Sequence, residues 1–168
     1  MLDDELDERF SHDNTKHFIW DVRDLDKPVL KKRIVSEQTA VDHNQYIVGD
    51  YTYQSNYEAG LRIMHIDEAK YDLQEVAYFD VYPSSTTATF QGSWSNYPYF
   101  KSGNVVISSI EYGLFVVRPE MNAIEAEVKR NASFGQQRRT RTLFHAKANA
   151  SCPYALEDIQ QCTTAKGC

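Results

Sequence analysis

The sequence predicts an all-β fold made of repeated units, and three observations lead to this prediction. Tyr and Phe favour the half-buried surface of a sheet, and the 168 residues include eleven Tyr and eight Phe. The segment 73–81 alternates apolar and polar side chains, as a strand with one buried face does. Short apolar runs also recur in the same order along the chain, which indicates copies of one structural unit.

Three pairs of similar segments define the repeat. The stretch PVLKKRIV resembles LQEVAYFDV, VDHNQYIVGDYTY resembles WSNYPYFKSGNVVIS, and GLRIMHI resembles GLFVVRP. An earlier FIWDV matches the last strand of the unit, so the closing strands recur after about 44 and then 53 residues. A period of about 40 to 50 residues filled with short strands is typical of a β-propeller blade.

The predicted architecture is therefore a partial β-propeller, with about two four-stranded blades, one strand of a third, and an irregular or partly helical C-terminal tail. A closed ring needs at least about four blades. The chain is accordingly expected to be a piece of a longer protein or to pair with other copies.

Three regions follow from this reading: an acidic N-terminal segment at 1–17, propeller blades at 18–119, and a tail at 120–168. The polar stretches 24–28 and 67–71 are interpreted as links between successive blades.

Gly60 and Gly113 are each placed in a turn, where glycine supplies positive φ at low steric cost. The tail begins with residues 120–130, whose composition favours a short exposed helix or disorder.

The charges are unevenly distributed. Residues 3–26 hold nine acidic against three basic side chains, and residues 128–147 hold six Lys or Arg and no acid. Both runs are read as solvated segments. With a net charge of −6 and no basic fold motif, the chain is not expected to bind nucleic acid.

No stretch is long and apolar enough for a membrane helix, and the start MLDDELDERF lacks the apolar core of a signal peptide. Two features nevertheless point to a secretory setting. Cysteine is confined to the tail, and two glycosylation sequons lie there too: Cys152, Cys162, Cys168, Asn131 and Asn149. The odd number of cysteines leaves one thiol free or paired outside the chain.

The segments FIWDVRDLDKPVL, VDHNQYIVGDYTYQSNYEAGLRI and VAYFDVYPSSTTATFQGSWSNYPYFKSGNVVISSIEYGLFVV resemble the choice-of-anchor B family. Its members carry LVIVD-type propeller repeats and are sometimes labelled regulatory P domain-containing proteins. The resemblance covers 18–119 and rests on the ordered blocks DHN-x-Y, QSNY-x-AGLR and SNYPYF-x-SG. It implies an extracellular or surface-attached propeller, and it implies no catalytic residue.

The corner formed by Asp42, His43 and Asn44 is the first candidate site. When the repeats are aligned on their glycines, His43 falls opposite Asn96, so both corners should lie on one rim. Asn56 and Tyr57, on a turn within the unit, are further candidates for ligand binding.

Three interpretations of this corner remain open. The polar side chains could cap turns and join blades. They could bind a ligand, and calcium is the one metal suggested, through Asp42, Asn44 and Asp50. His43 could also be a general base in a hydrolase, although neighbouring residues in a strand point to opposite faces, which disfavours an Asp42–His43 hydrogen bond. No residue is assigned as catalytic or as a metal ligand.

A second candidate is an aromatic cluster, which reads either as packing between blades or as a platform for a sugar or peptide: Trp94, Tyr97, Tyr99 and Phe100. The function predicted from all of this is non-catalytic recognition or adhesion, with an extracellular protein or glycan as partner. The alternatives are a hydrolase or a calcium-dependent binding propeller on the Asp42 corner, and a fragment without a function of its own.

Overall fold

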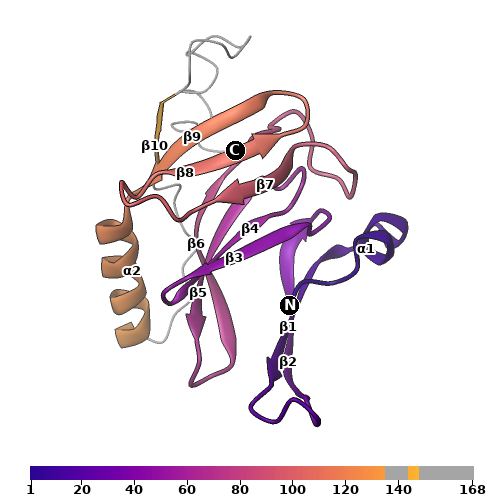
Figure 1. Cartoon of the computed structure of the whole chain (residues 1–168), viewed down its shortest axis with the longest axis vertical. Coiled ribbons are helices and arrows are strands. Elements are labelled where there is room, and N and C mark those ends of the chain that lie inside the picture. Colours follow the sequence, from indigo (N-terminus) through magenta and orange to yellow (C-terminus); the bar gives the residue numbers. More distant parts are fainter. Residues whose placement is uncertain (135–143, 148–168) are drawn as a thin grey trace.

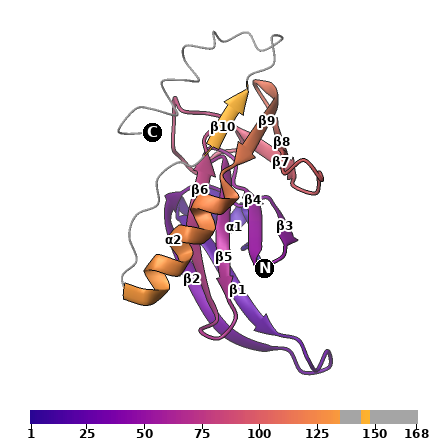
Figure 2. The ribbon, with the colours of Figure 1, turned by 90° about the vertical axis from the view of Figure 1, so that its left-hand side faces the viewer.

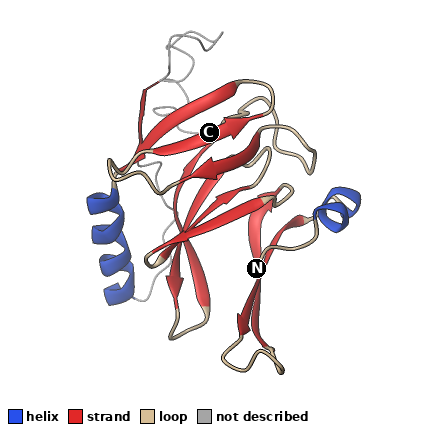
Figure 3. Ribbon diagram, in the orientation of Figure 1, coloured by secondary structure: helices blue, strands red, loops and turns tan. Residues whose placement is uncertain are grey.

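A computed structural model describes residues 1–134 and 144–147 of the chain. This part of the chain contains ten strands in three antiparallel sheets and two helices, which confirms the all-β prediction (Figures 1 and 3). The elements are α1 (Glu5–Ser11), β1 (Asn14–Asp21), β2 (Val29–Thr39), β3 (Asn44–Val48), β4 (Tyr51–Ser55), β5 (Leu61–Asp67), β6 (Asp72–Phe79), β7 (Ser93–Tyr97), β8 (Val105–Ser109), β9 (Gly113–Pro119), α2 (Met121–Phe134) and β10 (Phe144–Lys147).

The second and third sheets each have four strands, in the orders β3-β4-β5-β6 and β7-β8-β9-β10. All neighbours pair antiparallel, and the fourth strand of the third sheet, β10, comes from the C-terminal tail. The first sheet is a hairpin of two strands, β1 and β2. The sequence analysis predicted only one strand for this sheet, because β2 was interpreted as the first strand of the next unit.

The prediction that 24–28 and 67–71 link successive units is wrong. Residues 22–28 join β1 to β2, and residues 68–71 join β5 to β6, so both are hairpin turns inside one sheet. In the second turn, Asp67 accepts a hydrogen bond from the backbone N–H of Lys70 at 3.1 Å, and Tyr71 has a positive φ of 52°. The repeat visible in the sequence is thus offset from the sheets, since each copy begins with the outer strand of the sheet before it.

Strand β4, in the second sheet, contacts the first sheet through one face and the third sheet through the other. On one face Gln54 Oε1 is 2.8 Å from His17 Nε2 of β1. On the other face Ser55 Oγ accepts a hydrogen bond of 2.8 Å from Asn96 Nδ2 of β7. Because successive side chains of a strand point to opposite faces, these bonds place the first sheet on one side of the second and the third sheet on the other.

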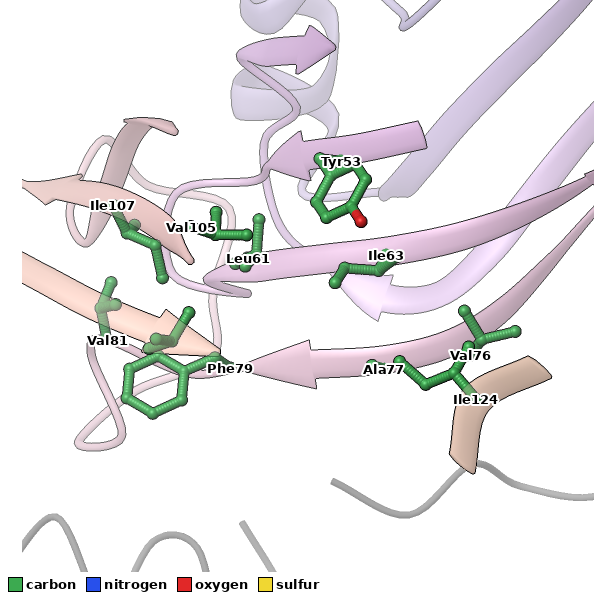
Figure 4. Packing of buried hydrophobic residues seen from close by; sticks show 11 residues of the cluster. Tyr53, Leu61, Ile63, Val76, Ala77, Phe79, Val81, Val105, Ile107 and Ile124 are labelled. Carbon is green, nitrogen blue, oxygen red and sulfur yellow. The ribbon is translucent and has the colours of Figure 1, made fainter. Parts of the chain in front are cut away.

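The main hydrophobic core fills the space between the second and third sheets (Figure 4). Its fully buried members include Leu61 and Ile63 of β5, Ile107 of β8 and Val117 of β9. Helix α2 covers the β6 edge of this core, with Ile124 fully buried in it (Figure 2). The prediction of a helix after residue 120 is confirmed, but this helix is a packed element rather than an exposed one.

The acidic N-terminal segment is folded, and its acidic side chains are exposed or half-buried, as expected for a solvated surface, with the exception of the buried Glu8. Helix α1 begins at the N-cap Asp4, whose side chain accepts hydrogen bonds from the N–H groups of Leu6 and Asp7, and it ends at His12, which has a positive φ of 52°. Ahead of the helix, Leu2 bridges to His17 in the antiparallel sense, so that residues 1–3 line the free edge of β1.

Residues 135–143 of the basic run lie outside the described residues, as do Asn149 and all three cysteines. The other sequon residue, Asn131, lies within α2, and its Nδ2, the atom that would carry a glycan, is buried. The helix as described therefore gives no support to glycosylation at Asn131. Within the described ranges, no helix is long and apolar enough to cross a membrane.

Candidate functional site

The Asp42 corner lies where all three sheets meet. The backbone N–H of His43 donates to the carbonyl of Ser55 at 3.0 Å, and the side chain of Asn96 donates to the hydroxyl of the same Ser55. The two segments aligned in the sequence are therefore neighbours in space, as the repeat predicts. Asp42 and His43 project in different directions from this corner, which agrees with the argument against a bond between them.

The side chain of His43 packs among aromatic rings. Its ring centroid is 4.5 Å from that of Trp94 and 5.1 Å from that of Tyr57, and Tyr57 in turn lies 5.2 Å from Phe90. We call these four residues, His43, Tyr57, Phe90 and Trp94, the ring cluster. It joins the turns around β3 and β4 to the start of β7 and the loop before it.

Hydrogen bonding sets the proton position on His43. The amide Nδ2 of Asn44, which can only donate, lies 2.5 Å from His43 Nδ1. Nδ1 is therefore the acceptor, and the ring proton sits on Nε2, which faces Glu5 Oε1 of helix α1 at 3.4 Å. The carboxylate partner of His43 is thus Glu5, which the sequence analysis missed, and not Asp42.

Trp94 lies at an irregularity in β7. The register between β7 and β8 shifts between Ser93 and Ser95, so that Trp94 is an extra residue in the ladder. Trp94 is 49% exposed next to the buried Ser93, as alternation along a strand requires, and the extra residue places the next buried side chain, Asn96, three positions after Ser93. Its backbone is fixed by a hydrogen bond of 3.0 Å from Asn44 Nδ2 to the Trp94 carbonyl.

Tyr57 forms the buried base of the ring cluster. It is 2% exposed, has a positive φ of 38°, and its carbonyl accepts hydrogen bonds from the N–H groups of Gly60 and Ser93. Burial raises the pKa of its hydroxyl to about 12, so the ring stays neutral at physiological pH.

The loop that carries Phe90 is held by a buried carboxylate. Glu58 is 1% exposed and accepts hydrogen bonds from the backbone N–H of Thr87, at 2.7 Å, and from the hydroxyls of Thr87 and Thr89. These bonds position Phe90 against Tyr57.

A second aromatic group, the tyrosine patch, continues along the same edge and consists of Tyr46, Tyr97, Tyr99 and Phe100. The ring of Tyr97 lies 5.4 Å from Tyr99 and 4.9 Å from Phe100. Tyr99 also spans the two sheets, since its hydroxyl donates to the carbonyl of Ile47 at 3.3 Å.

The aromatic residues predicted from the sequence are mostly on the surface. Trp94 and Tyr97 are each 49% exposed, and Tyr99 and Phe100 are each 47% exposed. The interpretation of this cluster as packing between blades therefore holds for one side of the rings only. Their other side is open to solvent.

The remaining predicted residues are internal. Asn56 and Asn96 are 1% and 5% exposed, and each bonds to β4: Asn56 through Gln54 and Asn96 through Ser55. The bond of Asn96 joins two sheets, whereas that of Asn56 is local to the end of β4, and both amides are enclosed by the protein.

Asp42 is also internal, being 1% exposed. Its backbone N–H donates to Glu8 Oε2 at 2.7 Å, whereas neither of its own carboxyl oxygens has a hydrogen-bond partner. Burial and the neighbouring carboxyl of Glu8 raise the pKa of Asp42 well above its ordinary value.

The three oxygen ligands suggested for calcium, Asp42, Asn44 and Asp50, do not come together at this corner. Asp50 follows β3, whereas Asn44 begins it, so the length of the strand, roughly 15 Å, separates them. Asp42 faces Glu8 in the interior. Within residues 1–134 and 144–147, no group of three His, Cys, Asp or Glu side chains is arranged to hold a metal ion.

The corner thus combines an exposed aromatic surface with a buried pair of carboxyl groups. Comparisons with protein-family models, with curated proteins and with solved structures found no match to this chain.

Proposed function

We propose that this chain is a non-catalytic recognition module, a partial β-propeller of the choice-of-anchor B type, which binds a glycan outside the cell. The stacking of three antiparallel sheets in chain order is what successive blades would produce, and it supports the propeller interpretation. The extracellular setting is inferred from the resemblance and from the cysteines and sequons of the tail.

The observation that carries the proposal is the row of half-exposed rings from Trp94 to Phe100. Four aromatic side chains within seven residues each leave about half of their surface in solvent. Aromatic rings pack against the apolar C–H faces of sugars, and Tyr hydroxyls offer hydrogen bonds at the edge of the same surface. Contacts among the rings and with the backbone fix them in advance, so little conformational entropy would be lost on binding.

The arrangement also argues against catalysis as the first choice. His43 is enclosed by Tyr57 and Trp94, and its Asn44 contact occupies the nitrogen that could accept a proton. A hydrolase is the second candidate, favoured by one contact, His43 Nε2 with Glu5 Oε1 at 3.4 Å. If this pair did chemistry, Glu5→Gln would abolish any hydrolytic activity while leaving glycan binding intact.

Replacement of Trp94 tests the recognition function. We expect Trp94→Ala to weaken glycan binding at least about tenfold, which corresponds to roughly 1.4 kcal/mol, because a central aromatic side chain carries a large share of binding energy. The measurement is a glycan array followed by titration calorimetry with the best array ligand.

The matched control is Trp20→Ala. Trp20 is 39% exposed but lies on β1, away from both aromatic groups, so its removal should leave affinity unchanged. Equal losses in the two variants, or an array without any bound glycan, would contradict the proposal.

A further inference from the structure

Helix α1 lies against the ring cluster. Besides the contact between Glu5 and His43, the guanidinium of Arg9 sits 6.0 Å from the centroid of the Phe90 ring. Residues on two successive turns of α1 therefore border the ring cluster. How α1 is attached to the sheets decides whether the helix covers these rings.

A buried carboxyl group attaches the helix. Glu8 is fully buried, its Oε1 accepts a hydrogen bond of 3.0 Å from the N–H of Lys16, and its Oε2 accepts one of 2.7 Å from the N–H of Asp42. One side chain thus ties α1 both to β1 and to the Asp42 corner. Leu6 and Phe10, by contrast, are 55% and 77% exposed and hold the helix little.

Glu8 lies next to a second buried acid, Asp42, and the usual neutralising partner is missing from their contacts. The nearest lysine, Lys16, directs its Nζ away from the pair, to Asp3 at 3.3 Å and Asp13 at 3.2 Å. The carboxyl oxygens of Asp42 form no hydrogen bond of normal geometry, and the backbone N–H of Lys16 is the one donor near enough to favour its charged form. Two carboxylates cannot both be charged at low cost in such a place.

The other groups around the pair do not change this balance. Asp3 adds negative charge, and Lys16 and the amino nitrogen of Met1 add positive charge from the β1 side. His17 is buried against Gln54, and burial lowers its pKa, so its imidazole contributes no charge at neutral pH.

We propose that α1 is a pH-controlled cap on the ring cluster, fastened while the Glu8 carboxyl is protonated and loosened when that carboxyl ionises beside Asp42. The ring cluster contacted by α1 includes Trp94, the first residue of the glycan surface, and in that respect the inference rests on the proposed function. The attachment of α1 by itself does not depend on what the rings bind.

The sign follows from proton linkage. In the docked state, burial raises the pKa of Glu8 from 4.5 to about 7, outweighing the hydrogen bonds from the N–H groups of Asp42 and Lys16, which lower it. A detached helix would give Glu8 its ordinary value. The docked state therefore holds more protons between these two values, and detachment becomes easier as the pH rises through this interval. Above about pH 7 the effect of Glu8 levels off. The raised pKa of Asp42 acts in the same direction.

Hydrogen exchange measured by mass spectrometry tests the cap directly. After correction for the intrinsic exchange rate with unstructured peptides, the amides of α1 should exchange roughly tenfold faster or more at pH 7 than at pH 5.5. Amides of β4 and β5 should show no such change. The wild-type protein alone can overturn the proposal. It would do so if the exchange rates of α1 and β5 changed equally with pH, or if exchange in α1 did not change.

Two variants locate the effect. Glu8→Gln keeps the shape and stays neutral, so α1 protection should become nearly independent of pH. Asp7→Asn removes an exposed acid of the same helix and should leave the wild-type response intact. If Glu8→Gln does not fold, Asp42→Asn serves in its place and should reduce the pH response. A full response in the folded variant would refute the role of the pair.

The consequence for binding is measured separately. The probe is a glycan found on the array. The affinity of the wild-type protein for this glycan should change between pH 5.5 and 7, whereas the affinity of the Glu8→Gln variant should stay the same. A pH response of α1 without any glycan binding would refute the proposed function and leave the cap. A glycan that binds with a pH-independent helix would refute the cap alone.

Discussion

Gly60→Ala should be among the most destabilising single substitutions in this chain, lowering the free energy of unfolding by about 3 kcal/mol or more. Gly60 has a φ of 73°, which costs an L-residue roughly 1–2 kcal/mol. In addition, a Cβ at this position would lie 2.3 Å from the carbonyl oxygen of Phe79 and 2.9 Å from the Cα of Asp80. Both are backbone atoms, so the β5–β6 pairing would have to shift. Urea denaturation followed by circular dichroism measures the loss.

The repeat supplies a matched control for this prediction. Gly113 occupies the corresponding position as the first residue of β9 and has a φ of 77°, but a Cβ there meets no atom within 4 Å. Gly113→Ala should therefore cost only the backbone term, roughly 1–2 kcal/mol. Equal losses at the two glycines would mean that the close approach to Phe79 is not present in solution.

Ile124→Ala should lower the free energy of unfolding by about 3 kcal/mol. The side chain is fully buried in the core between the second and third sheets, and truncation of a buried Ile removes apolar contacts and leaves a cavity. The result matters because Ile124 lies beyond residues 18–119, where the sequence predicts the repeated units. A loss of this size would show that α2 is part of the folded domain.

The control is Ile110→Ala, the same substitution at a residue that is 47% exposed. Its expected effect is below about 1 kcal/mol, as for surface positions in general. Should Ile124→Ala behave like Ile110→Ala in thermal and urea unfolding, α2 would not be packed on the sheets as described.

The strands could be predicted because their side-chain pattern is local. Alternation marked the segment 73–81, and the strand found there is β6, Asp72–Phe79. Both glycines predicted to have positive φ do so. The grouping of strands into sheets could not be predicted in the same way. A polar stretch such as 67–71 has the same composition whether it forms a hairpin turn inside a sheet or a link between units.

The aromatic residues of the site could also be predicted from the sequence, but the orientation of the side chains around them could not. Trp94 and Tyr97 were identified as members of an aromatic cluster, and they lie on the surface. Nothing local shows that β7 has a bulge at Trp94, or that Asp42 faces the interior while His43 faces a ring. Those orientations depend on which sheets meet at the corner.

The residues that the sequence analysis missed come from the segment that looked least structured. Glu5 and Glu8 belong to an acidic stretch, and acidic stretches are usually solvated. Their spacing of three residues, after an N-cap at Asp4, was a signal of one helix face. What no spacing could reveal is that Glu8 would be buried against the backbone of Lys16 and Asp42.

The position of β10 in the chain has a consequence for how the domain is made. The third sheet receives β7, β8 and β9 in direct succession, and its last strand only after a fourteen-residue helix and a further stretch of chain. On the ribosome, the first two sheets could therefore assemble while the border of β9 is still bare. Any nascent or clipped polypeptide that lacks residues 144–147 would present this border to other strands, which makes it the place where misassembly should begin.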